Sequence, residues 1–479
     1  MKKIIFVNLS RTVQRFPLGL AYLISTVREK TDHEPILFDE GYYADKLGRS
    51  SSECLELFRE LFLKTKPDYV GFTLYQQHIE QFLGYAKLIR SSGARCKIIV
   101  GGPHPTVFKE QMTRNLAEID ILVIGEGEKI LSQILNSEDL NSIPNIVFRK
   151  DGKVIATERK PNYNFRIDEL PWPARDAFDM KMYAQAYPVR TRPTAVMLFS
   201  RGCSGSCSFC ISRQIYGAYR SRDPHDAIRE IKALLKKHPF IENIYFTDNC
   251  FNLKDANTLR FLELFYSEGL HRRISIAVQT RLDLVDKETV RLLKDSNCCF
   301  VGIGIESFSK HIQRRMGKTF SYAEFEKKDA LLKKAGLFTP YYMMMNYPGM
   351  SFEDVMFNFR KIRELKLPFV LIMQFTPVPG TKAFDELARA HEIPILSDPA
   401  LDWHSNFIQS QYTSKDYLRL TSPQMKEYER QKSALSRRNA FNYFASLGLR
   451  QKVSFFIQRV IQNPVQASRF VIDNFAFWR

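Results

Sequence analysis

The sequence lacks the features that would place the protein in a membrane or outside the cell. In its 479 residues no apolar run approaches the ~18–20 residues that a membrane-spanning helix requires. The start of the chain, residues 1–8, carries two lysines, but its apolar stretch is too short for a signal peptide and predicts a buried strand instead. Eight cysteines, three of them in one loop, indicate a reducing compartment rather than a disulfide framework. We therefore expect a cytoplasmic protein.

Recognised nucleic-acid-binding modules are also missing, although the formal net charge is +18 at pH 7. Such a surplus can attract nucleic acid, an anionic membrane surface or an acidic substrate, and it can also be a plain solvated surface. Without a module we expect no nucleic-acid partner. The hydrophobic fraction of 44% and charged fraction of 25% are typical of a globular protein, and the length allows two or three domains.

The most informative stretch is the loop at residues 200–210. Its cysteines, Cys203, Cys207 and Cys210, are spaced C-x3-C-x2-C directly after the apolar run 194–199. A zinc site normally has four ligands, and no fourth cysteine or histidine lies close by in the sequence. Chance clustering fits poorly, because free cysteine prefers buried apolar positions. Three thiolates suit an iron–sulfur cluster in which one iron stays open for a substrate.

With Phe209 in the aromatic position, this motif resembles the signature of the radical S-adenosylmethionine (SAM) enzymes. The resemblance implies that the three cysteines hold a 4Fe–4S cluster, whose open iron binds the amino and carboxylate groups of SAM. It also implies a low-potential electron donor such as flavodoxin or ferredoxin. Reductive cleavage of SAM would then give a 5′-deoxyadenosyl radical that abstracts hydrogen from an unactivated carbon.

Residues 1–150 alternate strand-like and helical patterns, which predicts parallel α/β units with glycine-rich turns at the strand ends. The stretches 17–19, 101–106 and 125–128 together resemble the cobalamin-binding domain that precedes many radical SAM cores. The resemblance implies a Rossmann-like domain with cobalamin contacts at Pro17, Leu18, Thr73, Gly101, Gly102, His104, Thr106, Gly125, Gly127 and Glu128.

A histidine ligand for cobalt is not expected. The D-x-H-x-x-G pattern that supplies a lower cobalt ligand in other cobalamin proteins is missing. A single histidine in a Gly/Pro loop, as His104 is, more often makes a hydrogen bond in a turn. Whether the domain is occupied stays open, because some relatives keep it without using the cofactor.

Residues 151–190 show no sustained period and contain several prolines, which predicts a linker. Residues 191–395 contain six strand-plus-helix units, which suits the partial (β/α)6 barrel of TIM type found in the radical SAM family. Polar residues follow the strands, where such a barrel places its chemistry. Here the resemblance implies SAM contacts at Phe209, Asp248, Arg281, Glu306 and Met345, although methionines in the run 343–345 are more often core residues.

The remaining residues, 396–479, predict a mostly helical C-terminal extension. The stretch 442–479 mixes aromatic and basic residues. Two interpretations stay open: a basic amphipathic helix on the inner face of a membrane, or a helix packed across the barrel mouth.

Together these patterns predict a radical SAM enzyme that transfers a methyl group from cobalamin to a small hydrophobic or natural-product substrate, such as a lipid-like molecule or a tetrapyrrole. Oxidation, cyclisation or carbon–carbon coupling without methyl transfer is the alternative within the same chemistry. A non-catalytic basic protein that binds membrane or nucleic acid is a remote one. The sequence identifies no catalytic residue beyond these cofactor contacts.

Overall fold

The computed structural model describes residues 1–10, 15–137, 139–160, 166–186, 189, 192–373, 375–390, 420–447 and 452. The chain divides into two compact units. The first comprises Met1–Tyr187, Val196–Leu234 and Thr376–Thr413, and the second comprises Pro188–Ala195, Leu235–Phe375 and Ser414–Arg479. The cysteine loop therefore belongs to the same unit as the N-terminal α/β domain. The predicted domain boundaries at 150, 190 and 395 stay predictions.

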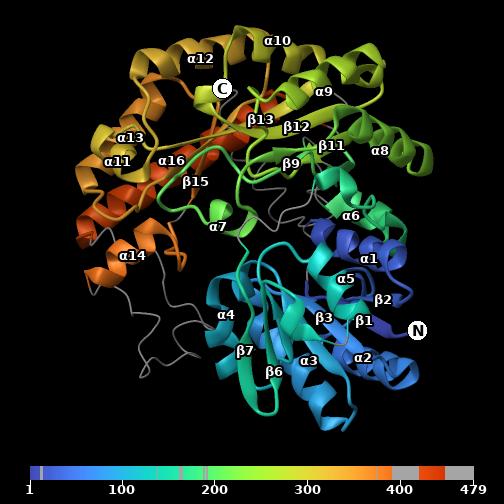
Figure 1. The fold of residues 1–479 in the computed structure, drawn as a ribbon. Coiled ribbons are helices and arrows are strands. Elements are labelled where there is room, and N and C mark those ends of the chain that lie inside the picture. The colour runs from blue at the N-terminus through green and yellow to red at the C-terminus, as the bar shows by residue number, and fades with distance from the viewer. Residues whose placement is uncertain are drawn as a thin grey trace. The chain divides into compact units, whose positions relative to one another are not determined.

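A seven-stranded sheet forms the centre of the first unit, in the order β2-β1-β3-β4-β5-β6-β7 (Figure 1). Its first five strands pair in parallel, and the last two are added antiparallel as a hairpin. The hairpin turns at Asp151 and Gly152, which both have positive φ, as the favoured two-residue turn requires. The strands are β1 (Lys3–Asn8), β2 (Glu34–Asp39), β3 (Tyr69–Thr73), β4 (Lys97–Gly101), β5 (Ile121–Val123), β6 (Ile146–Lys150) and β7 (Lys153–Ala156).

Helices cover both faces of this sheet, which explains why its central strands are continuously apolar. In β1, Ile5 and Val7 join a core with Phe58 of α2 and Tyr85 of α3, while Ile4 and Phe6 are buried on the other face. Figure 1 shows α2 and α3 on one side of the sheet and α1 and α5 on the other. The helices are α1 (Leu18–Lys30), α2 (Ser51–Thr65), α3 (Ile79–Ser91), α4 (Pro103–Asn115) and α5 (Glu128–Asn136).

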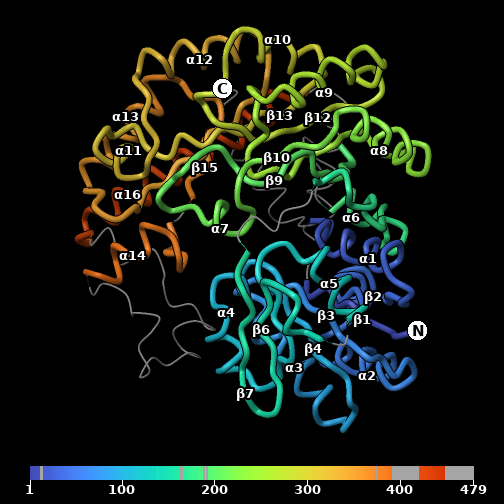
Figure 2. Tube along the Cα trace, viewed as in Figure 1, coloured from blue at the N-terminus to red at the C-terminus, as the bar shows by residue number. Residues whose placement is uncertain are grey.

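Several further elements follow the first sheet along the chain. The strands β9 (Ser200–Arg201) and β10 (Arg220–Ser221) pair antiparallel and bracket the cysteine loop (Figure 2). The helices among them are α6 (Met180–Ala186), α7 (Ser212–Tyr216) and α8 (Pro224–Lys237). Further along the chain, α14 (Lys382–Arg389) also contacts the loop, because the Ala383 N–H donates to the Ser208 carbonyl at 2.9 Å.

The second sheet has six strands in the order β15-β14-β13-β12-β11-β8, and the neighbours from β11 to β15 pair in parallel. The six predicted strand-and-helix units of the partial barrel are confirmed. The strands are β8 (Thr194–Met197), β11 (Asn243–Phe246), β12 (Ser275–Arg281), β13 (Cys298–Glu306), β14 (Pro340–Met344) and β15 (Phe369–Met373). The helices between them are α9 (Ala256–Ser267), α10 (Lys287–Asp295), α11 (Lys310–Met316), α12 (Tyr322–Ala335) and α13 (Phe352–Glu364).

The long helix α16 (Ser422–Ala445) packs against the edge strand β15. It begins in a capping box between Thr421 and Gln424. The Asn439 amide accepts a hydrogen bond from the Val370 N–H at 3.0 Å and donates to the Val370 carbonyl, which satisfies the outward backbone groups of the edge. No helix among the described residues is long and apolar enough to cross a membrane. Most of the predicted amphipathic stretch 442–479 lies outside the described residues.

Candidate active site

Cys203, Cys207 and Cys210 lie on the single loop between β9 and α7. Cys203 and Cys207 are half-buried and Cys210 is exposed, and none of the three forms a disulfide. The loop turns on itself through its own backbone: the Cys210 N–H donates to the Cys207 carbonyl at 3.1 Å, and the Gly205 N–H lies 3.3 Å from the Cys203 sulfur. Three accessible thiols are thus held on one short segment, as the sequence predicted.

A close backbone approach closes the loop immediately before its first cysteine. Gly202 has φ +79°, and a Cβ at this position would lie 2.7 Å from the Ala218 carbonyl oxygen. Only glycine adopts this conformation readily and leaves this space free. The two ends of the loop can therefore meet at Gly202, which places Cys203 at the start of the turn.

The donor set fits an iron–sulfur cluster. Within the described residues, no three His, Cys, Asp or Glu side chains converge as the ligands of a single metal ion would. Thiolates of a cluster each bind a separate iron, and soft sulfur ligands favour such centres. The loop offers three thiols and no other ligand type, so Cys203, Cys207 and Cys210 are the residues that would hold the cluster.

A buried ion-pair network joins this loop to the glycine-rich turn after β5. The Arg201 guanidinium lies 3.0 Å from Glu126 and 2.5 Å from Glu128, and Arg220 lies 2.7 Å from the same Glu126 oxygen. The side chains of Arg201, Glu126 and Glu128 are 7%, 6% and 5% exposed. Burial alone would lower the pKa of Arg201, but the two carboxylates outweigh it and raise the pKa above its usual value. The Arg201 guanidinium therefore stays charged.

Sequence reasoning missed this network. Glu128 is predicted as a cobalamin contact, which stays a prediction, and the structure shows its carboxylate bonded to Arg201. Arg201 directly precedes Gly202-Cys203 in the sequence, which was the one available signal. Its partners lie 73 and 75 residues away, so no local pattern could identify them.

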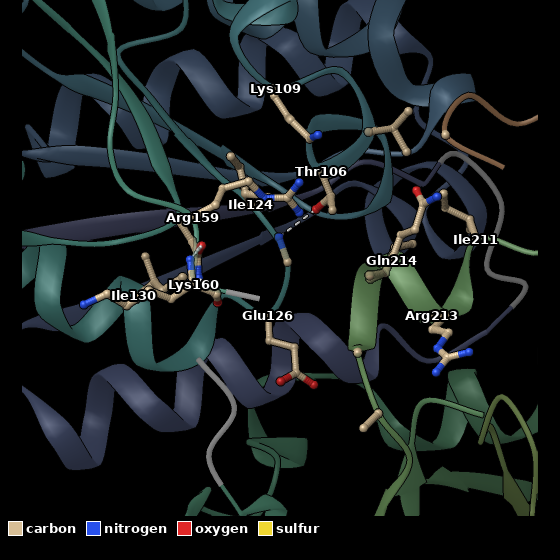
Figure 3. A pocket seen from close by; sticks show the side chains of 17 residues that line it. Thr106, Lys109, Ile124, Glu126, Ile130, Arg159, Lys160, Ile211, Arg213 and Gln214 are labelled. Carbon is tan, nitrogen blue, oxygen red and sulfur yellow. Dashed lines mark hydrogen bonds between the residues drawn. The ribbon is translucent and has the colours of Figure 1, made fainter. Parts of the chain in front are cut away.

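A cavity of about 620 Å³ lies against the same turn (Figure 3). On one side it is lined by Thr106 of α4 and by Gly125, both predicted cobalamin contacts, and on the other by Ile211 and Gln214 near the cysteine loop. The Thr106 hydroxyl accepts a hydrogen bond from the Gly125 N–H at 2.9 Å and donates to the Gly102 carbonyl at 2.7 Å. The cavity lies beside glycine turns at the carboxyl edge of a parallel sheet, which is where open α/β folds bind cofactors.

The other predicted cobalamin residues lie at the same edge but do not line the cavity. His104 is buried in α4, its ring centre is 4.4 Å from that of Phe108, and burial lowers its pKa to about 4. The pKa of this imidazole therefore keeps it neutral at pH 7. The remaining members are strand ends and helix starts: Thr73 ends β3, Gly101 ends β4, Gly102 precedes α4, Pro17 precedes and Leu18 begins α1, and Gly127 precedes α5.

In the second unit, the predicted SAM contacts stand at the ends of four neighbouring strands. Asp248 follows β11 and is buried, Arg281 ends β12, Glu306 ends β13 and Met345 follows β14. Because parallel strands share one carboxyl edge, these residues lie along the same edge of the sheet. Phe209 belongs to the cysteine loop of the first unit and is half-buried.

Glu306 is held in an uncommon conformation. Its φ is +61°, and the pairing of β13 with β14 shifts register between Gly304 and Glu306. Lys318 bonds its carboxylate at 2.7 Å and the Gly304 carbonyl at 3.0 Å. A Cβ on Gly304 would lie 2.6 Å from the Glu306 carboxylate. A left-handed non-glycine residue at a strand end is typical of a functional position.

Two of the other predicted SAM residues contact neighbouring side chains within the second unit. Arg281 forks onto Asp283 at 2.9 and 3.1 Å. Met345 is fully buried, and the Asn358 amide lies 3.6 Å from its sulfur, which is the contact of a core residue.

Three hydrogen-bonded side chains on the second sheet, Gln279, Tyr245 and Tyr342, were not among the predicted site residues. The Gln279 amide donates to the hydroxyls of Tyr245 and Tyr342 at 2.6 and 3.1 Å. A Cβ on Gly302 would lie 2.8 Å from the Tyr342 hydroxyl, so glycine leaves the room for this contact. Only the fold brings these three strands together.

Comparisons with known proteins match this arrangement. The family model "Radical SAM superfamily" matches residues 197–375, and "B12 binding domain" matches residues 6–135. An uncharacterized methyltransferase of Pyrococcus horikoshii is 27% identical over 374 residues, covering 77% of this chain and 78% of the relative. The anaerobic magnesium-protoporphyrin IX monomethyl ester cyclase of Rubrivivax gelatinosus is 24% identical over 382 residues, covering 75% and 67%.

Among solved structures, the radical SAM methyltransferase TsrM from Kitasatospora setae, with cobalamin and a [4Fe-4S] cluster bound, has a TM-score of 0.68 at 18% identity. The match covers 81% of this chain and 78% of TsrM, and at this identity it shows a shared fold. The predicted fold class and family are confirmed, and the expected cofactors are those of the two matched families. The chain therefore carries a B12-binding domain at residues 6–135 ahead of a radical SAM domain at residues 197–375.

Proposed function

We propose that the protein is a cobalamin-dependent radical SAM methyltransferase that modifies an unactivated carbon of a small hydrophobic or natural-product substrate. The observation that carries the proposal is the buried Arg201–Glu126 ion pair. It ties the loop of three thiols to a turn that lines the cavity, so the proposed cluster and cobalamin sites belong to one unit. The methyltransferase among the relatives supports the same choice.

The cofactors would supply the reactive groups: a carbon radical from SAM on the reduced cluster, and a transferable methyl group from cobalamin. The protein holds and orients them. Cys203, Cys207 and Cys210 would bind the cluster, and Arg201 and Gly202 fix the start of their loop. In the second unit, Glu306 would accept hydrogen bonds from SAM, and Lys318 keeps that carboxylate in place.

Radical chemistry without methyl transfer is the second candidate, because one relative is a tetrapyrrole cyclase. Its substrate also supports a tetrapyrrole as one candidate substrate class here. The same proposal includes an electron donor such as flavodoxin or ferredoxin, a cytoplasmic location and a peripheral membrane contact through 442–479. The last rests on the basic and aromatic composition of that stretch.

Anaerobic purification tests the proposal. We expect iron and the visible absorbance of a cluster in the wild type, and loss of both when Cys203, Cys207 or Cys210 is replaced by alanine. Cys299→Ala is the control, since Cys299 is a half-buried thiol outside the loop. A colourless, iron-free wild type would refute the enzyme. An iron-loaded protein that does not retain hydroxocobalamin would favour chemistry without methyl transfer.

A further inference from the structure

Two cations in the wall of the cavity form no salt bridge among the described residues. Lys109 of α4 and Arg159, which follows β7, both line it. In the part of the chain that the structure describes, neither side chain makes a hydrogen bond or an ion pair, and Figure 3 shows both projecting toward the same space. The one carboxylate in the lining, Glu126, is already paired with Arg201 and Arg220.

The backbone of Lys109 is held in an uncommon conformation that presents the side chain here. Lys109 has φ 49° and ψ −126°, and α4 kinks at this residue. For a residue with a Cβ this conformation is costly, and such strain clusters at ligand-binding positions. Burial and then the charge of Arg159 lower the pKa of Lys109, while the charge of Glu110 acts in the opposite direction.

The backbone around Arg159 is held as firmly. Asn145 is buried, with φ 60°, and its N–H donates to the Glu158 carbonyl at 3.0 Å. Its side-chain amide donates to the Lys160 carbonyl at 3.1 Å and accepts from the Lys160 N–H at 2.8 Å. Asn145 therefore bonds the residues on both sides of Arg159, Glu158 through its backbone and Lys160 through its side chain, and this fixes where the guanidinium starts.

We propose that Lys109 and Arg159 form a phosphate-binding subsite in the wall of this cavity. Two cations held together repel each other, and an anion that accepts hydrogen bonds from both of them removes the repulsion. A planar guanidinium beside an ammonium suits the oxygens of a phosphate ester. The subsite deepens the proposed function and rests on it where the phosphate is the phosphodiester of cobalamin's nucleotide tail. A phosphorylated substrate carries the same chemistry.

Binding of two corrinoids separates these sources. Cobinamide lacks the phosphate and nucleotide of cobalamin. If the tail phosphate binds here, Lys109→Gln and Arg159→Gln each weaken hydroxocobalamin binding roughly tenfold, the usual effect of losing a charge-assisted hydrogen bond, and leave cobinamide binding unchanged. Equilibrium dialysis read by visible absorbance measures both. Lys87→Gln and Arg114→Gln, at exposed cations away from the cavity, are matched controls.

Inorganic phosphate is the third probe. If the source is a phosphorylated substrate, the variants bind both corrinoids as the wild type does, but phosphate stabilises the wild type against heat and not the variants. The conservative changes Lys109→Arg and Arg159→Lys keep the charge and should keep the binding, which guards against misfolded glutamine variants. Variants that match the wild type with all three probes overturn the subsite. A wild type that binds neither corrinoid refutes the cobalamin role alone, because the phosphate experiment still decides the subsite.

Discussion

Replacing Gly202 with alanine tests whether close backbone approach shapes the cysteine loop. The positive φ of +79° costs an L-residue about 1–2 kcal/mol. The new Cβ would also lie 2.7 Å from the Ala218 carbonyl oxygen, where ordinary contacts begin at 3.4 Å. The two strands of the loop must therefore separate by about 0.7 Å, the difference between these values. Metal-binding constellations tolerate about 0.5 Å, so the next residue, Cys203, would be displaced too far.

A second glycine isolates the steric part of this effect. Gly93 has φ +69° and no heavy atom within 4 Å of its would-be Cβ, so Gly93→Ala carries only the backbone cost. We expect urea unfolding of the iron-free protein to show a loss of about 1–2 kcal/mol in Gly93→Ala and a larger loss in Gly202→Ala. Iron bound after anaerobic reconstitution should fall several-fold in Gly202→Ala alone. Full iron loading in Gly202→Ala would show that this approach does not position the thiols.

Two further substitutions probe the same unit. Arg201→Met leaves two buried carboxylates without this cation and should lower the free energy of unfolding in urea by about 3–5 kcal/mol. The control Arg28→Met, in the exposed pair with Asp176, should lower it by less than about 1 kcal/mol. Equal losses in the two variants would contradict the burial argument. His104 has a folded pKa of about 4 against 6.5 for the free side chain, so the unfolded chain binds more protons between these values. The free energy of unfolding should therefore fall, by up to roughly 3 kcal/mol, as the pH drops through this window. Unfolding measured at pH 7 and about pH 5 should show a smaller loss of stability in His104→Gln than in the wild type. An unchanged pH dependence in the variant would refute it.

The sequence predicted those parts of the site that local patterns encode. Strands ending in polar residues placed Asp248 and Glu306 at one sheet edge, because parallel strands in series leave few alternatives. The cysteine spacing is a local property of one loop, so the three thiols were predicted without any knowledge of the fold.

Local sequence patterns could not predict the partners of charged side chains that pair with residues far away in the sequence. Glu128 begins α5, where a carboxylate suits the helix dipole whatever its partner, so its sequence position did not distinguish a cofactor contact from an ion pair with Arg201. Lys109 is inside a helix with no unusual neighbours in the sequence. Its strained backbone and its proximity to Arg159 follow from tertiary packing alone.

The Arg201 network is better explained by positioning than by stability. Removing two carboxylates and a guanidinium from water is costly, and apolar residues of similar volume often stabilise a fold as well or better. A guanidinium, however, has donors in a fixed planar fork, which sets direction as apolar contacts do not. Arg201 uses this fork on Glu126 and Glu128, two residues of the turn beside the cavity, and the chain continues from it into Gly202 and Cys203. The orientation of the cysteine loop toward the cavity wall is therefore set by charge pairing. Apolar residues of similar volume in place of Arg201, Glu126 and Glu128 together should preserve the fold more readily than this orientation.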